Sequence, residues 1–321
     1  MTVTEKRPVL VATEADDITA DMVIAELNRL DVPVVRFNPA DIEAETLTVS
    51  ARFGTCPAPV AGHVRTPSRT ADLAQVRAVY WRRPVWPTYP NLRHDDALFA
   101  AAQARYGLGG TLYAMEGPVW VNHPHHVAAA DYKPAQLALA QRLGLAVPPT
   151  LVTNDPDDAR EFIAAHDRVI YKTLRWTPYQ RDGVAVTGWA DLVTAAEVDD
   201  SLRVTPHLFQ AVVDKVADLR VLIVGRRVFA VRITSGLLDW RTDYSALSYD
   251  VVDLPAAVEK SLLTYLDRCG LVSGSFDLAV SGDGDLWWLE LNPNGQWGWL
   301  EPHTGLDMSA AFAALLAGDT P

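Results

Sequence analysis

Two short segments near the C-terminal end of the chain constrain its fold more than any other feature. Residues 275–280 and residues 286–292 alternate apolar and polar side chains, and this period of two is typical of a half-buried β-strand. Residues 282–285 read Gly-Asp-Gly-Asp, a composition that favours a tight turn. The two segments therefore predict an antiparallel hairpin in which Ser281 pairs with Leu286.

Counting back along this hairpin places Asp277 directly opposite Glu290, with Cβ atoms about 5 Å apart. Strict alternation puts Asn292 on the same face as the two carboxylates. We expect this face to be a cluster of oxygen atoms and the other face to be part of the core. The predicted core face consists of Phe276, Leu278, Val280, Trp287, Leu289 and Leu291.

The facing carboxylates predict a cation site. Two carboxylates at this separation repel each other by about 3 kcal/mol at an effective dielectric constant of about 20, so a cation would stabilise the pair. Oxygen ligands without His or Cys favour Mg²⁺ or Mn²⁺ over zinc. Asp277, Glu290 and Asn292 are therefore candidate metal ligands. The alternative is an acidic hairpin face that is exposed to solvent.

Two lysines lie where an anionic partner is expected. Lys172 ends the apolar segment 169–171, where an unpaired ammonium would be costly, and Lys133 begins an Ala-rich helical segment. Beside a hard-metal site both are candidate phosphate ligands, although a single lysine of this kind is often a surface residue. The chain has no P-loop motif, and no GxGxxG motif follows its first strand, so a different nucleotide fold would be required.

The order of predicted elements indicates a mixed α/β and α+β chain. Its 321 residues are enough for two or three domains. Residues 8–12 and 32–37 read as strands on either side of a helix that Thr19 can cap, which is typical of an α/β unit. Residues 128–143 predict one Ala- and Leu-rich helix closed by Gly144, after which short strands and helices alternate.

Composition argues against several classes of function. The formal net charge of −12 opposes broad binding to nucleic acid, because that affinity depends on Lys and Arg contacts to phosphates. The charge is uneven, since residues 51–110 carry eight Arg and three Asp, and no Lys or Arg follows Arg268. No apolar run approaches the roughly 18 residues that cross a bilayer, and Cys56 and Cys269 belong to no metal or disulfide motif. We expect a cytoplasmic protein with neither nucleic acid nor a membrane as partner.

These residues together resemble the ATP-grasp superfamily, and specifically its ribosomal peptide maturases, the microviridin-type or graspetide macrocyclases. The Glu-x-Asn-Pro element is common to much of the superfamily, whereas the Asn-Gly-Gln-Trp extension is similar to the maturase branch. The resemblance spans most of the chain. Its segments are residues 274–277 (GSFD), residues 288–299 (WLELNPNGQWGW), Lys133 with Gln136, and residues 144–150, 172–174, 209–221 and 239–241.

The resemblance implies an ATP-grasp fold in three parts. Residues 1–118 would form an N-terminal α/β, or pre-ATP-grasp, domain. Residues 119–207 would form a linker helix and a central lid subdomain, and residues 208–321 the C-terminal catalytic ATP-grasp lobe. Relatives of this kind suggest a homodimer.

The resemblance also implies ATP and Mg²⁺ as cofactors, with two magnesium ions. The metal ligands would be the candidate carboxylates and amide of the hairpin, and the two lysines would contact the α- and β-phosphates. A hinge strand would offer backbone groups to adenine. The further residues that it assigns are Gln210, Ala211 and Val212 in this hinge, Lys215 near it, and Arg220 and Arg232 near the γ-phosphate and the acyl phosphate.

The implied activity is ATP-dependent macrocyclisation of a ribosomal precursor peptide made of a leader and a core. An Asp or Glu side chain would be activated as an acyl phosphate and joined to a Thr or Ser hydroxyl as an ω-ester, or to a Lys amine as an ω-amide. Asp239 and Arg241 are candidates for positioning the core, although a surface ion pair is an open alternative. Arg82 and Arg83, in the Arg-rich segment 64–105, either bind the leader or solvate the first domain.

Two other functions remain open at this stage. One is a small-molecule amino-acid or peptide ligase similar to glutathione synthetase or to glutamate ligases, and Trp297 and Trp299 favour the maturase over it. The other is an ATP-binding regulatory module without catalysis, similar to synapsin. Retention of all three candidate metal ligands argues against that module, because binding alone does not need all of them.

Overall fold

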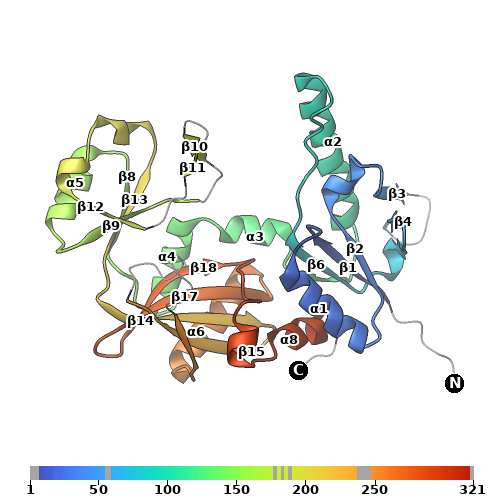
Figure 1. Ribbon diagram of the computed structural model, residues 1–321. Coiled ribbons are helices and arrows are strands. Elements are labelled where there is room, and N and C mark those ends of the chain that lie inside the picture. Colours follow the sequence, from blue (N-terminus) through green and yellow to red (C-terminus); the bar gives the residue numbers. More distant parts are fainter. Residues whose placement is uncertain are drawn as a thin grey trace.

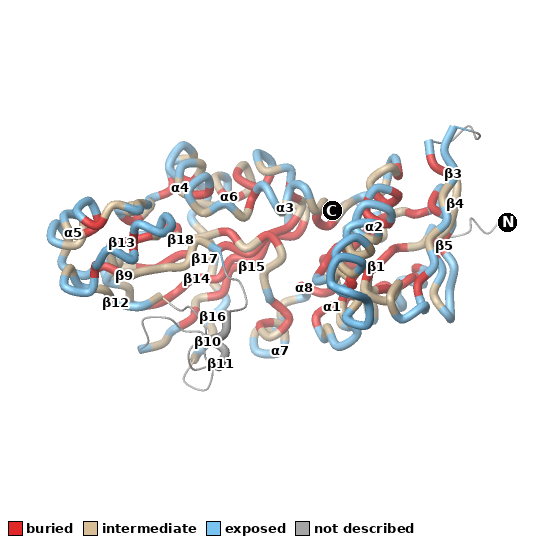
Figure 2. The backbone as a smooth tube through the Cα atoms, turned by 90° about the horizontal axis from the view of Figure 1, so that it is seen from above, coloured by how far each residue is buried: buried red, intermediate tan, exposed pale blue. Residues whose placement is uncertain are grey.

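The computed structural model describes residues 7–54, 59–175, 179–181, 184–186, 190–236 and 247–318. Its sheets form three units, an N-terminal unit, a central unit and a C-terminal lobe, which lie in a row with the lobe in the middle (Figures 1 and 2). No helix in the described ranges has the length and apolar character to cross a membrane.

The N-terminal unit is built on a parallel sheet in the order β2-β1-β6-β7. Asp17, and not Thr19 as predicted, caps its first helix, because the Asp17 carboxylate accepts a hydrogen bond from the Ala20 N–H at 3.2 Å. A small antiparallel sheet in the order β3-β4-β5 completes the unit. Its elements are β1 (Val9–Thr13), α1 (Ile18–Arg29), β2 (Val34–Phe37), η1 (Pro39–Ile42), β3 (Thr48–Arg52), β4 (Ala61–Arg65), β5 (Thr70–Asp72), η2 (Leu73–Gln75), β6 (Ala78–Arg83), α2 (His94–Tyr113) and β7 (Val119–Val121).

The segment that follows forms two helices instead of the single helix predicted over 128–143. Helix α3 (Pro124–Ala130) ends before Tyr132, and α4 (Lys133–Arg142) begins after it. Pro134 explains the break, since it lies in the first turn of α4, where its missing N–H needs no partner, whereas in one continuous helix it would remove a hydrogen bond. Gly144 follows α4 with a φ of 78°, the left-handed conformation that the predicted helix end requires.

The central unit is an antiparallel sheet in the order β12-β9-β13-β8, with α5 packed on one face. On that face Phe209 and Val169 pack against Ala159 of the helix. The opposite face carries Ile170, Lys172 and Gln210. The elements are β8 (Thr150–Thr153), α5 (Pro156–Ala164), β9 (Val169–Lys172), the hairpin β10 (Tyr179–Arg181) and β11 (Val184–Val186), β12 (Asp191–Val193), η3 (Ala195–Glu197), η4 (Asp200–Val204) and β13 (His207–Ala211).

The C-terminal lobe is a five-stranded antiparallel sheet in the order β16-β15-β14-β17-β18. One face packs against α6, where Leu262 and Tyr265 meet Val221 and Phe276. The elements are β14 (Lys215–Val224), β15 (Arg227–Thr234), β16 (Ser248–Val251), α6 (Ala256–Cys269), β17 (Ser273–Ser281), β18 (Leu286–Asn292), α7 (Glu301–Thr304) and α8 (Met308–Ala317).

The other face of this sheet shares one apolar core with the N-terminal unit. Leu222 and Val231 of the sheet pack in the same cluster as Val23 and Leu27 of α1, together with Phe312 of α8. Figure 2 shows buried backbone continuing from the strands of the lobe to β1 through this region. A continuous apolar core fixes the two units relative to each other, because separating them would expose that surface to water.

The hairpin of β17 and β18 contains a β-bulge that changes the predicted register. Asp277 pairs with Glu290 as predicted, but Val280, and not Ser281, pairs with Leu286. The register shifts between Asp277 and Leu278, so that Leu278 pairs with Trp288. One extra residue on β18 therefore offsets a turn that closes one residue earlier than predicted.

This bulge also corrects the predicted core face of β18. Trp288 is fully buried in the core under α6, whereas Trp287 and Leu289 are only partly buried. Leu289 instead lines the cleft that holds Glu290. A bulge turns the side chains beyond it to the opposite face, which a strict period of two cannot anticipate.

The sheets place the predicted domain limits within a few residues of strand ends. β7 (Val119–Val121) hydrogen-bonds to β6, so the N-terminal sheet extends past residue 118. β13 (His207–Ala211) pairs with β8 and β9, so the central sheet extends past residue 207. The lobe begins with β14 at Lys215.

Candidate functional site

A cleft lies between the central sheet and the sheet of the C-terminal lobe. The chain crosses from one sheet to the other at residues 212–214, which we call the hinge. Nearly all residues of the cleft come from β9, β13, the hinge, β14, β17 and β18. They are Ile170, Lys172, Ala190, Gln210, Ala211, Val212, Val213, Lys215, Asp218, Asp277, Ala279, Leu289 and Glu290.

The structure brings the three candidate metal ligands together, with Asp277 and Glu290 on one wall of this cleft and Asn292 against both of them. Asp277 and Glu290 are paired across β17 and β18. The amide nitrogen of Asn292 donates to Asp277 Oδ2 at 3.0 Å and to Glu290 Oε1 at 3.3 Å. The predicted convergence of these side chains is confirmed.

A cationic side chain flanks each carboxylate. Arg220 lies opposite Asp277 on β14, and its Nη1 donates to Asp277 Oδ1 at 2.5 Å. Lys133 Nζ lies 3.3 Å from Glu290 Oε2. The side chains of Arg220 and Asp277 are only 7% and 15% exposed, so water screens this pair weakly. The row of two anions between two cations is neutral as a whole.

The donor set fits a hard divalent cation bound through oxygen. The described part of the chain contains no group of three or more His, Cys, Asp or Glu side chains that could hold a metal. The candidate set here combines two carboxylates with one amide. Rotation of the Asn292 amide about its last side-chain bond would present oxygen in place of nitrogen. Carboxylate and amide oxygens without nitrogen or sulfur ligands suit Mg²⁺.

Of the two lysines, Lys172 lines the cleft and Lys133 lies beside it, against Glu290. Lys172 Nζ donates to Gln210 Oε1 at 2.8 Å. Lys133 Nζ donates to the carbonyl oxygen of Thr173, the residue after Lys172, at 3.1 Å. Two ammonium groups beside paired carboxylates form a site that can accept both the phosphates and the metal of a metal–nucleotide complex.

The end of β13 and the hinge form the wall beyond the lysines, but two N–H groups there already donate hydrogen bonds within the protein. The Ala211 N–H donates to Pro149 O and the Val212 N–H to Arg168 O, both at 2.9 Å. The prediction that these residues offer backbone groups to adenine must therefore rest on other groups of the hinge. The Gln210 side chain donates to Thr150 Oγ1 at 2.9 Å, which holds its oxygen toward Lys172.

Lys215 lines the cleft, but it is paired within the protein. Its Nζ lies 2.8 Å and 2.6 Å from the two carboxylate oxygens of Asp218. Asp218 is a cleft residue that the sequence analysis missed. The spacing of three residues gave no signal, because residues i and i+3 of a regular strand point to opposite faces, and here an irregularity between Lys215 and Ala217 shifts the register.

Of the remaining predicted residues, the structure describes Arg232 and places it away from this wall. Arg232 pairs with Leu219 on β14, whereas Arg220 pairs with Val231, so the two arginines project from opposite faces of the sheet. Asp239 and Arg241 lie outside the described residues. Of the two predicted catalytic arginines that the structure describes, Arg220 contacts a candidate metal ligand.

Arg82 and Arg83 differ in their surroundings, although they are neighbours. Arg82 is 3% exposed and contacts the loop after β18, so it cannot bind a leader peptide or solvate the surface as predicted. Arg83 is exposed and lines a second cleft between α1 and residues 296–302. Arg82 continues a run of buried strand residues, and a charged side chain in such a run requires an internal partner.

The fold and this cleft define a protein of the ATP-grasp class. Two sheets joined by a hinge enclose a cleft with lysines on one side and paired carboxylates of a C-terminal hairpin on the other. No protein-family model matches the sequence, and no curated protein sequence matches it. The relationship is visible in solved structures.

The chain is similar over almost its whole length to ATP-grasp ligases of peptide maturation. A Chryseobacterium gregarium RiPP-associated ATP-grasp ligase, in complex with ADP and a leader and core peptide, has 26% identity and a TM-score of 0.89, and the match covers 98% of both chains. Macrocyclase MdnC of Microcystis aeruginosa MRC, bound to precursor peptide MdnA, has 25% identity and a TM-score of 0.86 over 97% of this chain and 99% of that one.

A third structure leads to the same family. Macrocyclase MdnB of Microcystis aeruginosa MRC has 26% identity and a TM-score of 0.82, and covers 97% of this chain and 99% of its own. The resemblance to the graspetide-type maturases and the ATP-grasp fold are therefore confirmed.

Proposed function

We propose that the protein is an ATP-dependent carboxylate ligase that macrocyclises a ribosomally made precursor peptide. The observation that carries the proposal is the cleft, in which the Lys172 ammonium and the paired carboxylates of Asp277 and Glu290 face one space. The similarity of the whole chain to ligases bound to ADP and to precursor peptides supports a precursor peptide as the substrate. ATP as substrate supports a cytoplasmic location.

The residues of the cleft divide the work of binding the nucleotide. Asp277, Glu290 and Asn292 would hold Mg²⁺, which supplies positive charge to the phosphates when it is bound. Lys133 and Lys172 would contact phosphate oxygens, and their present partners, Glu290 and Gln210, keep both ammonium groups at the cleft. Arg220 orients Asp277 and adds positive charge beside the transferred phosphoryl group.

The proposed reaction has two chemical steps. A carboxylate oxygen of a core Asp or Glu attacks the γ-phosphorus, and the bond to the β-phosphate oxygen breaks, which gives an acyl phosphate and ADP. A hydroxyl of Thr or Ser, or an amine of Lys, then attacks the acyl carbon, loses its proton and displaces phosphate. The products are an ω-ester or an ω-amide, and each cross-link removes one water from the peptide.

Holding both side chains of the core in one cleft lowers the barrier of the second step. Proximity and orientation contribute up to about 7–11 kcal/mol in well-aligned intramolecular reactions. A small-molecule ligase would use the same nucleotide groups, so the substrate decides between the two functions. The test is mass spectrometry of the short peptide encoded beside the gene, after incubation with the protein, Mg²⁺ and ATP. Successive losses of one water mass support the maturase, whereas ADP release with free amino acids and an unchanged peptide would refute it.

Leader binding is proposed for the exposed arginine of the second cleft. Arg83 lines this cleft beside Glu14 and Trp299, and an exposed guanidinium next to an aromatic ring suits a peptide side chain. We expect Arg83→Glu to weaken binding of the precursor at least tenfold without changing ATP affinity, since one good contact is worth about 1.4 kcal/mol. Isothermal titration with precursor and then with nucleotide measures both, and equal precursor affinity would contradict this role.

A homodimer is proposed through α2, which extends beyond its own sheet (Figure 1). Leu98, Phe99 and Tyr106 on this helix are 59%, 69% and 80% exposed. Apolar side chains gathered on a projecting helix favour association with a second copy. Light scattering after gel filtration tests this: the unaltered chain should be a dimer and a Phe99→Ser, Tyr106→Ser variant a monomer.

A further inference from the structure

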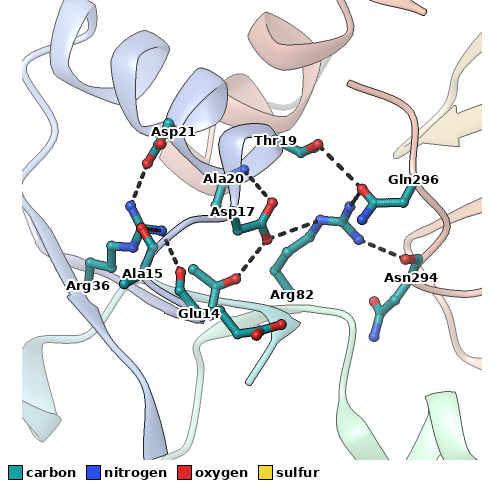
Figure 3. Close-up of polar contacts among 11 residues, drawn as sticks. Glu14, Ala15, Asp17, Thr19, Ala20, Asp21, Arg36, Arg82, Asn294 and Gln296 are labelled. Atoms are coloured by element: carbon teal, nitrogen blue, oxygen red, sulfur yellow. Dashed lines mark hydrogen bonds and ion pairs between the residues drawn. The ribbon is translucent and has the colours of Figure 1, made fainter. Parts of the chain in front are cut away.

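The loop after β18, residues 293–296, is held by an arginine of the N-terminal unit (Figure 3). Arg82, at the end of β6, donates through Nη1 to the carbonyl oxygen of Asn294 at 2.7 Å. Its Nη2 donates to the side-chain oxygen of Gln296 at 2.5 Å. A planar guanidinium fixes two acceptors at once, which a single ammonium cannot do. One side chain thus holds two residues of this short loop.

Arg82 is itself held rigidly by the N-terminal unit. Its Nε lies 3.8 Å from Asp17 Oδ2, and both side chains are almost fully buried. Asp17 caps α1 and also accepts a hydrogen bond from Thr13 Oγ1 at 2.7 Å. The Thr19 hydroxyl, one turn into the helix, donates to the same Gln296 side-chain oxygen at 3.4 Å. The N-terminal unit, which shares an apolar core with the lobe, therefore fixes the position of the loop.

The other side of the same loop contacts the candidate metal site. Arg220 donates through Nη2 to the backbone carbonyl of Gln296 at 3.1 Å and through Nη1 to Asp277 Oδ1 at 2.5 Å. Gly295 allows this approach, because a Cβ there would lie 2.8 Å from Arg220 Nη2 and 2.8 Å from Ser275 Cβ. Gln296 is thus gripped through its side chain by one arginine and through its backbone by another.

We propose that Arg82 and Gln296 are positioning residues for the nucleotide reaction. By fixing the Gln296 carbonyl, they fix the guanidinium of Arg220, and through it the carboxylate of Asp277. This inference rests on the proposed function, because it assigns these residues a part in aligning a metal ligand. It replaces the predicted role of Arg82 in leader binding. Neither residue lines the cleft that holds Asp277 and Glu290, although Gln296 lines the second cleft, so their effect on the metal ligands must pass through Arg220.

The experiment compares two variants that weaken the same contact. Gln296→Leu removes the side-chain acceptor but leaves the Asp17–Arg82 pair intact, and because Gln296 is exposed it should not impair folding. Arg82→Lys keeps a positive charge beside Asp17 but loses the two-point contact with the loop. The control is Arg36→Met. Arg36 donates to Asp21 and to the carbonyl oxygens of Glu14 and Ala15, near the same helix end, but contacts no residue of the loop in Figure 3.

The first readout is binding of Mg²⁺ with a non-hydrolysable ATP analogue, measured by calorimetry with and without the metal. Groups that orient a metal ligand from behind it typically contribute about 10- to 100-fold to metal affinity or activity. We expect Gln296→Leu and Arg82→Lys to weaken Mg²⁺ affinity by about this factor. Affinity for the analogue without metal should be unchanged, because the lysines and the hinge bind it. Arg36→Met should equal the unaltered protein in both.

The second readout is amide hydrogen exchange of residues 292–297, which does not depend on activity. It should become faster in both variants and stay the same in Arg36→Met. Because the two residues act through one loop, the double variant should lose no more than the weaker-binding single variant, whereas independent effects would multiply.

The outcomes separate this inference from the proposed function. Unaltered protein that binds the analogue without any Mg²⁺ dependence would refute both. Normal Mg²⁺ dependence in the unaltered protein, together with normal Mg²⁺ affinity in Gln296→Leu, would overturn the positioning role alone. Multiplicative losses in the double variant would also overturn it. Normal metal binding without any peptide condensation would reject the maturase and leave the positioning role standing.

Discussion

Replacing Asp277 by asparagine should separate the chemistry of the cleft from the stability of the fold. The substitution removes a charge without changing the size of the side chain. Arg220 and Asp277 have a nitrogen–oxygen distance of 2.5 Å, so their charge centres are about 4 Å apart and attract by about 4 kcal/mol at an effective dielectric constant of about 20. The repulsion between Asp277 and Glu290, at about 5 Å, costs about 3 kcal/mol on the same scale.

Asparagine removes both effects, so they nearly cancel. The expected net loss of stability is about 1 kcal/mol, which corresponds to a fall in Tm of about 2–4 °C. Catalysis has no such compensation, because one of two carboxylates that would hold Mg²⁺ is lost. A loss of several kcal/mol in transition-state charge stabilisation lowers the rate of ADP release by about 10³-fold or more.

Calorimetric unfolding and a coupled assay for ADP measure the two effects on one preparation. Asp283→Asn is the matched control, since Asp283 is an exposed carboxylate in the turn of the same hairpin. It should change neither quantity. Unchanged ADP release in Asp277→Asn would refute the metal assignment, and a fall in Tm far above the expected range would refute the charge balance.

Three further predictions concern Lys172, Gly295 and Tyr80. Lys172→Met should raise the KM for ATP at least tenfold, because it removes a charged phosphate contact worth about 1.5–3 kcal/mol. The control variant Lys260→Met, at an exposed lysine, should leave the KM unchanged. Steady-state kinetics measures both values. Gly295→Ala should destabilise the protein by about 1–3 kcal/mol and slow ADP release, because its Cβ would press on Arg220 and Ser275, while Gly107→Ala, in open space on a helix, should be neutral or stabilising in denaturant titrations. Burial, then the nearby Asp17 carboxylate against the opposing effect of Arg82, raises the pKa of Tyr80 to about 12 from 10.0. The unfolded chain therefore loses this proton first, so stability that is complete below pH 10 should fall by about 3 kcal/mol as the pH rises to 12, and Tyr80→Phe should lack this loss; equal pH profiles for the two proteins would contradict it.

The grouping of the three candidate metal ligands was predictable because its geometry is local. Asp277, Glu290 and Asn292 belong to one hairpin, and alternation within two neighbouring strands is enough to place them on one face. The bulge at Leu289 was not predictable, since a bulge depends on how the strands pack and leaves no mark in a period of two. The prediction of facing carboxylates held because the extra residue of the bulge offsets a turn that closes one residue earlier than predicted.

Contacts between distant segments could not be derived from spacing. Arg220 and Asp277 are 57 residues apart, and Arg82 and Gln296 are 214 apart, so only the assembled sheets bring them together. The burial of Arg82 shows the same limit, because a charged residue at a strand end looks like a surface group until its partner is known. Arg232 was misplaced for a related reason, since the face that a side chain takes depends on the register with β14.

The apolar core that joins the first unit to the C-terminal lobe decides which part of the enzyme can open to admit nucleotide. The two units form one body through the packing of Val23, Leu27, Leu222 and Phe312. The central sheet is connected to that body through the hinge and the segment around Pro149. The proposed exchange of ATP and ADP would then require the central sheet to move relative to this body. A chimera engineered for a new peptide specificity must accordingly take the first unit and the lobe from the same parent protein. The central sheet is the part that can come from another parent.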